Sequence, residues 1–301
     1  MNLDHVATPA KAWALILPAF FFFSLLDATA KYVVLSGLAP LFAVWCRFVG
    51  HAAFSVIALR VWRDPSVLRT KHPYQQILRG LILTFGTLTN FMALRHLQLA
   101  ETLALFLAGP MVITALSGPL LNEWAGWRRW LAILIGFVGV LVIVRPGTSM
   151  FQWPILWSVA SLTMASLYFI TTRKLTGTET DESMIVYSAL VPTLLLLPVP
   201  FIQGEVPGSM TIFFLLCLMG IFGAVGHLFV IKAHRIAPAP LIAPAVFSSI
   251  IWMVAFGYLI FDQLPDGWTI AGMAIIALSA FYILRRERFL KQQIAQVAIN
   301  A

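Results

Sequence analysis

Ten apolar stretches, most of them close to the length of a membrane span, follow one another along the chain. A transmembrane helix needs roughly 20 predominantly apolar residues to cross the hydrocarbon core of a bilayer. Charged residues, prolines or glycines separate the stretches, which lie at 12–34, 39–59, 75–97, 100–121, 127–144, 154–172, 184–201, 211–231, 238–260 and 268–284. We therefore predict an all-α polytopic membrane protein with ten transmembrane helices and short connections.

The composition excludes a water-soluble protein and offers little for metal or redox chemistry. Only 11% of the 301 residues are charged, whereas 60% are apolar, and the mean hydropathy is +0.89. Both cysteines, Cys46 and Cys217, lie in apolar stretches. We expect neither a disulfide framework nor a metal site from them. The first stretch is too long for a removable signal peptide and lacks its small-residue cleavage site, so we expect the mature protein to keep it.

The net charge of +8 follows from the placement of Lys and Arg around the predicted spans. With a cytoplasmic N-terminus, the inside segments hold 16 basic residues and the outside segments hold only Arg95 and Arg145. Cytoplasmic loops of membrane proteins carry such an excess. We therefore predict an inner-membrane protein with both termini in the cytoplasm. Contact with membrane lipids accounts for the basic residues, and a nucleic-acid partner is not expected.

The two halves of the chain align with an offset of about 140 residues, which indicates an internal repeat. His96 to Ala100 falls on Arg235 to Ala239, and Gly126-Trp127 falls on Gly267-Trp268. Because each half holds five spans, an odd number, the second copy must enter the membrane in the opposite orientation. We predict two inverted five-helix repeats at 1–148 and 149–288, followed by a cytoplasmic tail at 289–301.

Several residue patterns of the first half resemble the EamA branch of the drug/metabolite transporter superfamily over residues 12–284. The patterns are Lys31, Pro40 and Arg47; Ala93-Leu94-Arg95-His96; Gly109-Pro110 ahead of Glu123; and Gly136 with Gly139. The resemblance implies ten helices in two inverted repeats and a central cavity built mainly by the first four helices of each. The fifth helices, 127–144 and 268–284, would lie aside from it.

The chain also departs from that family's pattern. Asn122-Glu123 and Phe261-Asp262 stand where members commonly show Gly-Glu, and the seventh span has no intramembrane arginine to match Arg47. We expect the two walls of the cavity to differ chemically as a result.

Four polar residues of the first half are candidates for binding cargo, because an ionisable group inside a span is costly and often functional. They are Asp27, Lys31, Arg47 and Asn90, at similar predicted depth in the membrane. Asp27 and Lys31 are four residues apart on one helix face and could form a structural pair. Alternatively, Lys31 or Arg47 binds a carboxylate or phosphate of the cargo, Asp27 holds a cationic group or a proton, and Asn90 orients the cargo.

The second half and the helix breaks supply further candidates. Those for substrate binding are Trp157, Tyr168, Tyr187, His227, Ser248 and Trp252. Glu101 is a candidate gate, or alternatively a helix-start anion that suits the helix dipole. Pro110 and Pro244 are candidate hinges, because each removes a backbone donor within a span.

No catalytic motif, phosphate-binding loop or dinucleotide turn is present, so we predict neither an enzyme nor a bound cofactor. These features predict a secondary active transporter of small amphipathic metabolites, such as amino acids or related zwitterions, that works by alternating access. The family resemblance implies that the direction of transport is export. Efflux of lipophilic cations or drugs is the alternative, and a passive channel is disfavoured. Titratable Asp27, Glu101 and His227 favour proton coupling over sodium coupling. The sequence fits a monomer or a dimer.

Overall fold

The structure, a computed structural model, describes residues 9–121, 126–146, 151–205, 207–237, 242–279 and 281–282. All the regular structure in these ranges is helical. The first half contains α1 (Pro9–Leu35), α2 (Pro40–Ala58), the short 3-10 helix η2 (Pro65–Leu68), α3 (Pro73–Leu94), α4 (Leu99–Phe106), α5 (Gly109–Leu121) and α6 (Trp127–Val144). The second half contains α7 (Ile155–Leu175), α8 (Asp181–Leu195), α9 (Val199–Ile202), α10 (Met210–Ile236), the 3-10 helix η3 (Ala243–Ser248), α12 (Ser249–Phe261) and a C-terminal helix (Gly267–Ser279).

Seven helical segments in the described ranges are long and apolar enough to cross a membrane, and three shorter apolar helices accompany them. This confirms a multi-pass, all-helical membrane protein, while the count of ten spans stays a prediction. Two of the predicted spans are not continuous α-helices. The span 100–121 is divided into α4 and α5, and η3 replaces α-helix ahead of α12. Proline accounts for both changes, because it cannot donate a backbone hydrogen bond within a helix.

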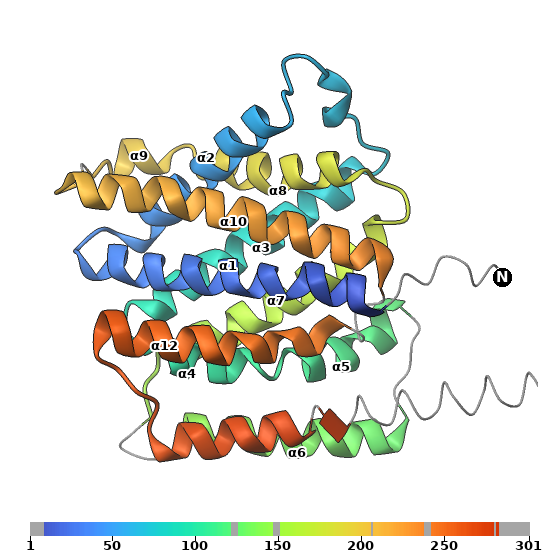
Figure 1. Ribbon diagram of the computed structural model, residues 1–301, viewed down its shortest axis with the longest axis vertical. Coiled ribbons are helices and arrows are strands. Elements are labelled where there is room, and N and C mark those ends of the chain that lie inside the picture. The colour runs from blue at the N-terminus through green and yellow to red at the C-terminus, as the bar shows by residue number, and fades with distance from the viewer. Residues whose placement is uncertain are drawn as a thin grey trace, which may run out of the picture.

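The two halves interleave instead of forming separate bundles. α1 of the first half packs along α10 of the second, α3 packs along α7, and α2 lies against α8 and α10. Figure 1 shows these helices running side by side, with α4 and α12 below α1 in that view. The core is therefore an interface between the halves.

α6 and the C-terminal helix form a pair at the side of the bundle (Figure 1). A Cβ atom on Gly139 of α6 would lie 2.9 Å from the backbone oxygen of Gly272, so the two backbones are close enough that glycine is required. Ser279 also donates a hydrogen bond to the backbone oxygen of Ala132. This position agrees with the place that the family resemblance gave the fifth helix of each half.

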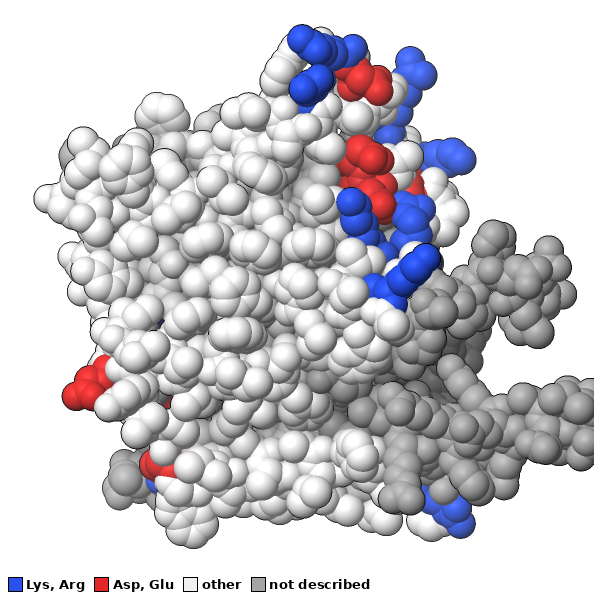
Figure 2. Space-filling model, viewed as in Figure 1, with Lys and Arg blue, Asp and Glu red and all other residues white. Residues whose placement is uncertain are grey.

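The surface separates a charged end from a long apolar belt. Figure 2 shows Lys and Arg gathered at the end of the bundle where α1 begins, together with several Asp and Glu side chains. Most of the visible surface between the two ends carries no charge. Many large apolar side chains of the helices are exposed, including Phe137, Phe214 and Ile251. Such a belt matches the hydrocarbon core of a bilayer.

Candidate functional site

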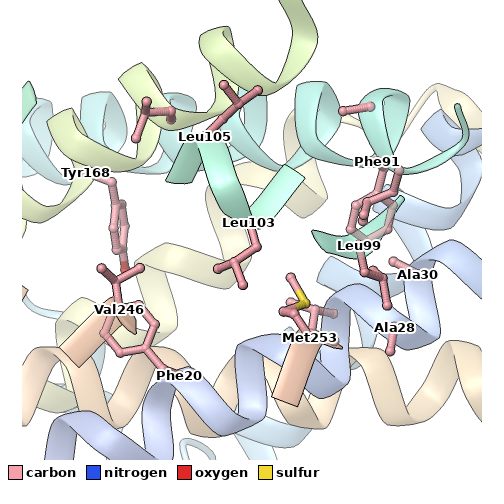
Figure 3. Packing of buried hydrophobic residues seen from close by; sticks show 14 of the residues in the cluster. Phe20, Ala28, Ala30, Phe91, Leu99, Leu103, Leu105, Tyr168, Val246 and Met253 are labelled. Atoms are coloured by element: carbon pink, nitrogen blue, oxygen red, sulfur yellow. The ribbon is translucent and has the colours of Figure 1, made fainter. Parts of the chain in front are cut away.

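A cavity of about 160 Å³ lies at the centre of the bundle, between helices of both halves. Side chains from α1, α2, α3, α4, α5, α7, α10, η3 and α12 line it, and most of them are apolar. The aromatic side chains are Phe20, Phe23, Phe91, Phe106, Tyr168 and Phe169. Figure 3 shows how several of the lining residues, including Leu103, Val246 and Met253, leave their helices. A ligand here would be enclosed mainly by rings and aliphatic groups.

Asp27 of α1 and Asn90 of α3 form the first polar pair of the lining. The Asn90 side-chain amide donates a hydrogen bond of 2.8 Å to the Asp27 carboxylate. Among the described residues that line the cavity, Asp27 is the one with an acidic side chain. Both residues were predicted to bind cargo, and the structure brings them together in the cavity wall.

Arg47 of α2 and His227 of α10 form the second polar pair of the lining. Arg47 is 2% exposed, and its two terminal nitrogens reach the Thr87 hydroxyl and His227 Nε2, each at 3.2 Å. Its guanidinium also lies 4.3 Å from the centre of the Phe48 ring. In the described part of the chain, Arg47 forms no ion pair with a carboxylate. A buried guanidinium of this kind offers a binding site for an anionic group.

Lys31 lies outside the lining, and it forms no ion pair with Asp27, which was one of the two alternatives that the sequence left open. The Lys31 ammonium donates hydrogen bonds of 2.5 and 3.5 Å to the backbone oxygens of Leu97 and Leu94, at the end of α3. It also lies 5.4 Å from the centre of the Phe261 ring. Lys31 therefore satisfies carbonyl groups at a helix end, which a sequence pattern of i and i+4 charges cannot reveal.

The predicted residues of the second half are dispersed. Tyr168 lines the cavity together with His227. Trp157 packs against Trp153, Trp252 packs against Phe21, Ser248 donates to the Ala245 backbone oxygen, and Tyr187 donates to the Leu68 backbone oxygen. These four residues lie outside the lining of this cavity.

The candidate gate and hinges lie at helix breaks. The Glu101 carboxylate accepts a hydrogen bond of 2.8 Å from the backbone N–H of Gln98 at the start of α4, as a helix-start anion would. Pro110 follows the break between α4 and α5 and lines the cavity. Pro244 lies in the 3-10 helix η3. Whether these prolines act as hinges stays a prediction.

Arg79 of α3 is a buried cation, although it was one of the 16 basic residues assigned to the cytoplasmic side. It is 0% exposed and extends from the first half into the second. It donates to the Tyr168 and Thr172 hydroxyls at 3.1 and 3.4 Å, and also to the Met184 backbone oxygen. The network ties α3 to α7 and α8 behind the cavity wall.

Helical spacing could have indicated both Arg79 and a second missed residue, His51. Gln76, Arg79 and Leu83 share one buried face of α3. Arg47, His51 and Ser55 are four residues apart along α2, and all three are buried. Polar residues at this spacing on an otherwise apolar helix face the protein interior more often than lipid.

Carboxylates of the second half contact helix starts of the first half at both ends of the bundle. Near the charged end, Glu179 accepts hydrogen bonds of 2.9 Å from the backbone N–H groups of Lys71 and His72, just before α3. At the other end, Glu205 accepts one of 2.8 Å from the backbone N–H of Ala39, just before α2. Each contact joins the two halves near one face of the predicted membrane.

Comparison with known proteins assigns this architecture to a family. The model of the EamA-like transporter family matches residues 10–145 and again residues 152–285. The double match supports the two-repeat architecture. A solved crystal structure of another protein, 20% identical, covers 92% of this chain and 98% of its own with a TM-score of 0.64, which supports the fold alone.

Three curated relatives match nearly the whole chain. An S-adenosylmethionine uptake transporter of Rickettsia conorii is 28% identical over 89% of this chain and 92% of its own. A riboflavin transporter of Vibrio cholerae is 27% identical over 95% and 96%, respectively. A pseudopaline exporter of Pseudomonas aeruginosa is 23% identical over 90% and 94%. All three are transporters, as expected for a chain without enzymatic motifs.

Proposed function

Because the chain belongs to the EamA-like transporter family, we propose that it is a secondary transporter for a small amphipathic zwitterion, an amino acid or a related metabolite. The observation that carries the proposal is the polar content of the cavity. Asp27 with Asn90 and Arg47 with His227 supply groups of opposite charge in a lining that is otherwise largely apolar and aromatic. A zwitterion with an apolar or aromatic part complements all three features.

Each polar pair has a role in the proposal. The Arg47 guanidinium receives the carboxylate of the cargo, since its charge lacks a carboxylate partner among the described residues. The Asp27 carboxylate receives the cationic group, and Asn90 holds that carboxylate in place. Phe20, Phe23 and Phe169 enclose the apolar part.

Alternating access would follow from movement of one repeat against the other. The Glu179 contacts would close the charged end, and the Glu205 contact would close the opposite end. We propose that the two sets open in turn, with the helix breaks at Pro110 and Pro244 absorbing the motion. The charged end would face the cytoplasm of an inner membrane, following the excess of basic residues there.

Export is the direction that we propose, from the family resemblance noted in the sequence. The relatives include both an uptake transporter and an exporter. Cargo loaded inside vesicles and cargo added outside should therefore be measured separately, with the protein in one known orientation.

Efflux of lipophilic cations is the second candidate, and one observation favours it. Asp27 is an acid in a largely apolar and aromatic cavity, which suits an apolar cation. Arg47 in the same wall opposes it, because two cations would be brought together in a site of low polarity.

The experiment combines ligand stabilisation with transport. Purified protein is heated with amino acids, S-adenosylmethionine, riboflavin, sugars and tetraphenylphosphonium, because a ligand that binds the folded state raises the unfolding temperature. Compounds that stabilise it are then assayed in proteoliposomes.

We expect zwitterions to bind and Arg47→Gln to weaken binding of a carboxylate-bearing compound more than binding of its amide. Arg95→Gln, on an exposed arginine, is the matched control. Stabilisation by tetraphenylphosphonium but by no zwitterion would contradict the proposal.

A further inference from the structure

The contact between Arg47 and His227 determines where the imidazole carries its proton. Arg47 Nη2 lies 3.2 Å from His227 Nε2. A guanidinium can only donate hydrogen bonds, so Nε2 must be the acceptor. The ring is therefore neutral in this state, with its proton on Nδ1. That Nδ1 is buried and has no hydrogen-bond partner among the described residues.

The groups packed around His227 favour a neutral ring. From α2, Arg47 contacts it and His51 stacks on it with ring centres 5.8 Å apart. From α7, Tyr168 meets it edge-on, and Arg79 of α3 lies behind Tyr168. From α1, Phe23 packs against the ring, and Asp27 lies on the same helix.

Charge at this site is therefore unbalanced. The Arg47 guanidinium contacts His227, and the Arg79 guanidinium lies beyond Tyr168, which packs on the same ring. The acid in the described lining, Asp27, is held by Asn90. A third positive charge on the imidazole would be repelled by both arginines. An anion that enters beside Arg47 reverses this balance, because it attracts a proton to the neighbouring ring.

Proton uptake would also change the hydrogen bonds. Once Nε2 holds a proton, it becomes a donor and can no longer accept from Arg47 Nη2. Two donors then face one another, and a carboxylate with its two oxygens can accept from both. Arg47 stays anchored meanwhile by its hydrogen bond to Thr87 and its contact with the Phe48 ring.

We propose that the Arg47–His227 pair binds one proton together with each carboxylate-bearing cargo molecule. The proton comes from water at the side where cargo enters, occupies Nε2, and leaves with the cargo at the other side. The inference rests on the proposed function, since it assigns the coupling ion of the same site. An inward proton gradient would then favour uptake, and net export would need an outward cargo gradient that exceeds it.

The first experiment needs no ligand. Protein labelled with ¹⁵N-histidine is studied by NMR at pH 7.5, and the His227→Gln variant identifies the His227 signals. We expect a neutral ring with its proton on Nδ1. A proton on Nε2, or a charged ring, in the empty protein would overturn the inference.

The second experiment measures protons taken up on binding, with a pH indicator in weak buffer. The probes are L-phenylalanine, which has a carboxylate, and L-phenylalaninamide, which does not. We expect uptake of about one proton per bound L-phenylalanine, and a Kd that rises about tenfold per pH unit near neutrality. At pH 6, where the amino groups of both probes are protonated in solution, L-phenylalaninamide should cause no uptake. His227→Gln should abolish the uptake, whereas His96→Gln, on an exposed histidine, should retain it.

The outcomes separate this inference from the proposed function. If L-phenylalanine binds without proton uptake, or if His227→Gln keeps the uptake, the coupling is refuted and the proposed function stands. If no zwitterion in the stabilisation screen binds, the proposed function fails. The NMR experiment on the empty protein still tests the proton position in that case.

Discussion

Replacing Gly220 by alanine tests the closest approach between the two halves. Gly220 of α10 faces Gly50 of α2, and a Cβ on Gly220 would lie 2.5 Å from the backbone carbon of Gly50 and 2.6 Å from His51 N. Neither backbone atom can rotate away as a side chain could. The helices must therefore separate by about 1 Å to restore ordinary van der Waals distances.

The expected cost follows from overpacking. Forcing an extra carbon into a close-packed interface destabilises a protein by about 1–3 kcal/mol, and the higher helix propensity of alanine offsets up to about 1 kcal/mol. The reciprocal change should cost less, because a Cβ on Gly50 would lie 3.2 Å from Gly220 Cα. The separation should also stretch the contact of 3.2 Å between Arg47 and His227, which bridges the same two helices.

Thermal unfolding of the purified variants, followed by transport in proteoliposomes, measures both effects. We expect Gly220→Ala to lower the unfolding temperature and transport, and Gly50→Ala to lower both less. Gly177→Ala is the control, because a Cβ there meets nothing within 4 Å. Equal effects of the Gly220 and Gly50 variants, or a Gly220 variant as stable as the control, would refute the close packing of α2 and α10.

Three further predictions concern other parts of the chain. Because Asp27 and Lys31 form no ion pair and have separate hydrogen-bond partners, the losses of stability in Asp27→Asn and Lys31→Gln should add within about 0.5 kcal/mol in the double variant. A double variant that unfolds at a clearly higher temperature than this sum requires would show that the two charges do pair. In the Arg63→Cys variant, the new cysteine should react with impermeant maleimide only after the cytoplasmic side is exposed. Labelling of this cysteine in intact cells would show that the orientation is opposite to the predicted one. Burial raises the pKa of Asp266, but hydrogen bonds from Thr269 and Arg145 outweigh it and bring the pKa below its ordinary 3.8. The stability that Asp266 supplies is thus present above pH 3.8 and is lost as the pH falls through the lower folded pKa. Asp266→Asn should be less stable than wild type, by less than about 1 kcal/mol, at neutral pH and equal to it at the acid extreme; an equal difference at both would contradict this.

The positions of Arg47, Asn90 and His227 in the cavity show what can be predicted from the sequence of single helices. A polar residue inside an apolar span is costly, so such residues are visible in the sequence, and these three do line the cavity. Arg79 was missed because its position near a predicted span end made it resemble an orientation anchor. Lys31 was placed with Asp27 because both lie on one helix, whereas its acceptors come from residues more than 60 positions away.

The sequence by itself determined that this chain is a helical membrane protein, where its apolar helices lie, and that it resembles a family of transporters. These properties depend on local hydropathy and on patterns within single spans, which the bilayer requires whatever the helices pack against. Tertiary structure alone decided which polar residues meet. Arg47 reaches His227 across 180 positions of chain, and Arg79 reaches Tyr168 across 89. The rotation of each helix about its axis is set by contacts such as Gly50 with Gly220, and those contacts determine which side chains face the cavity.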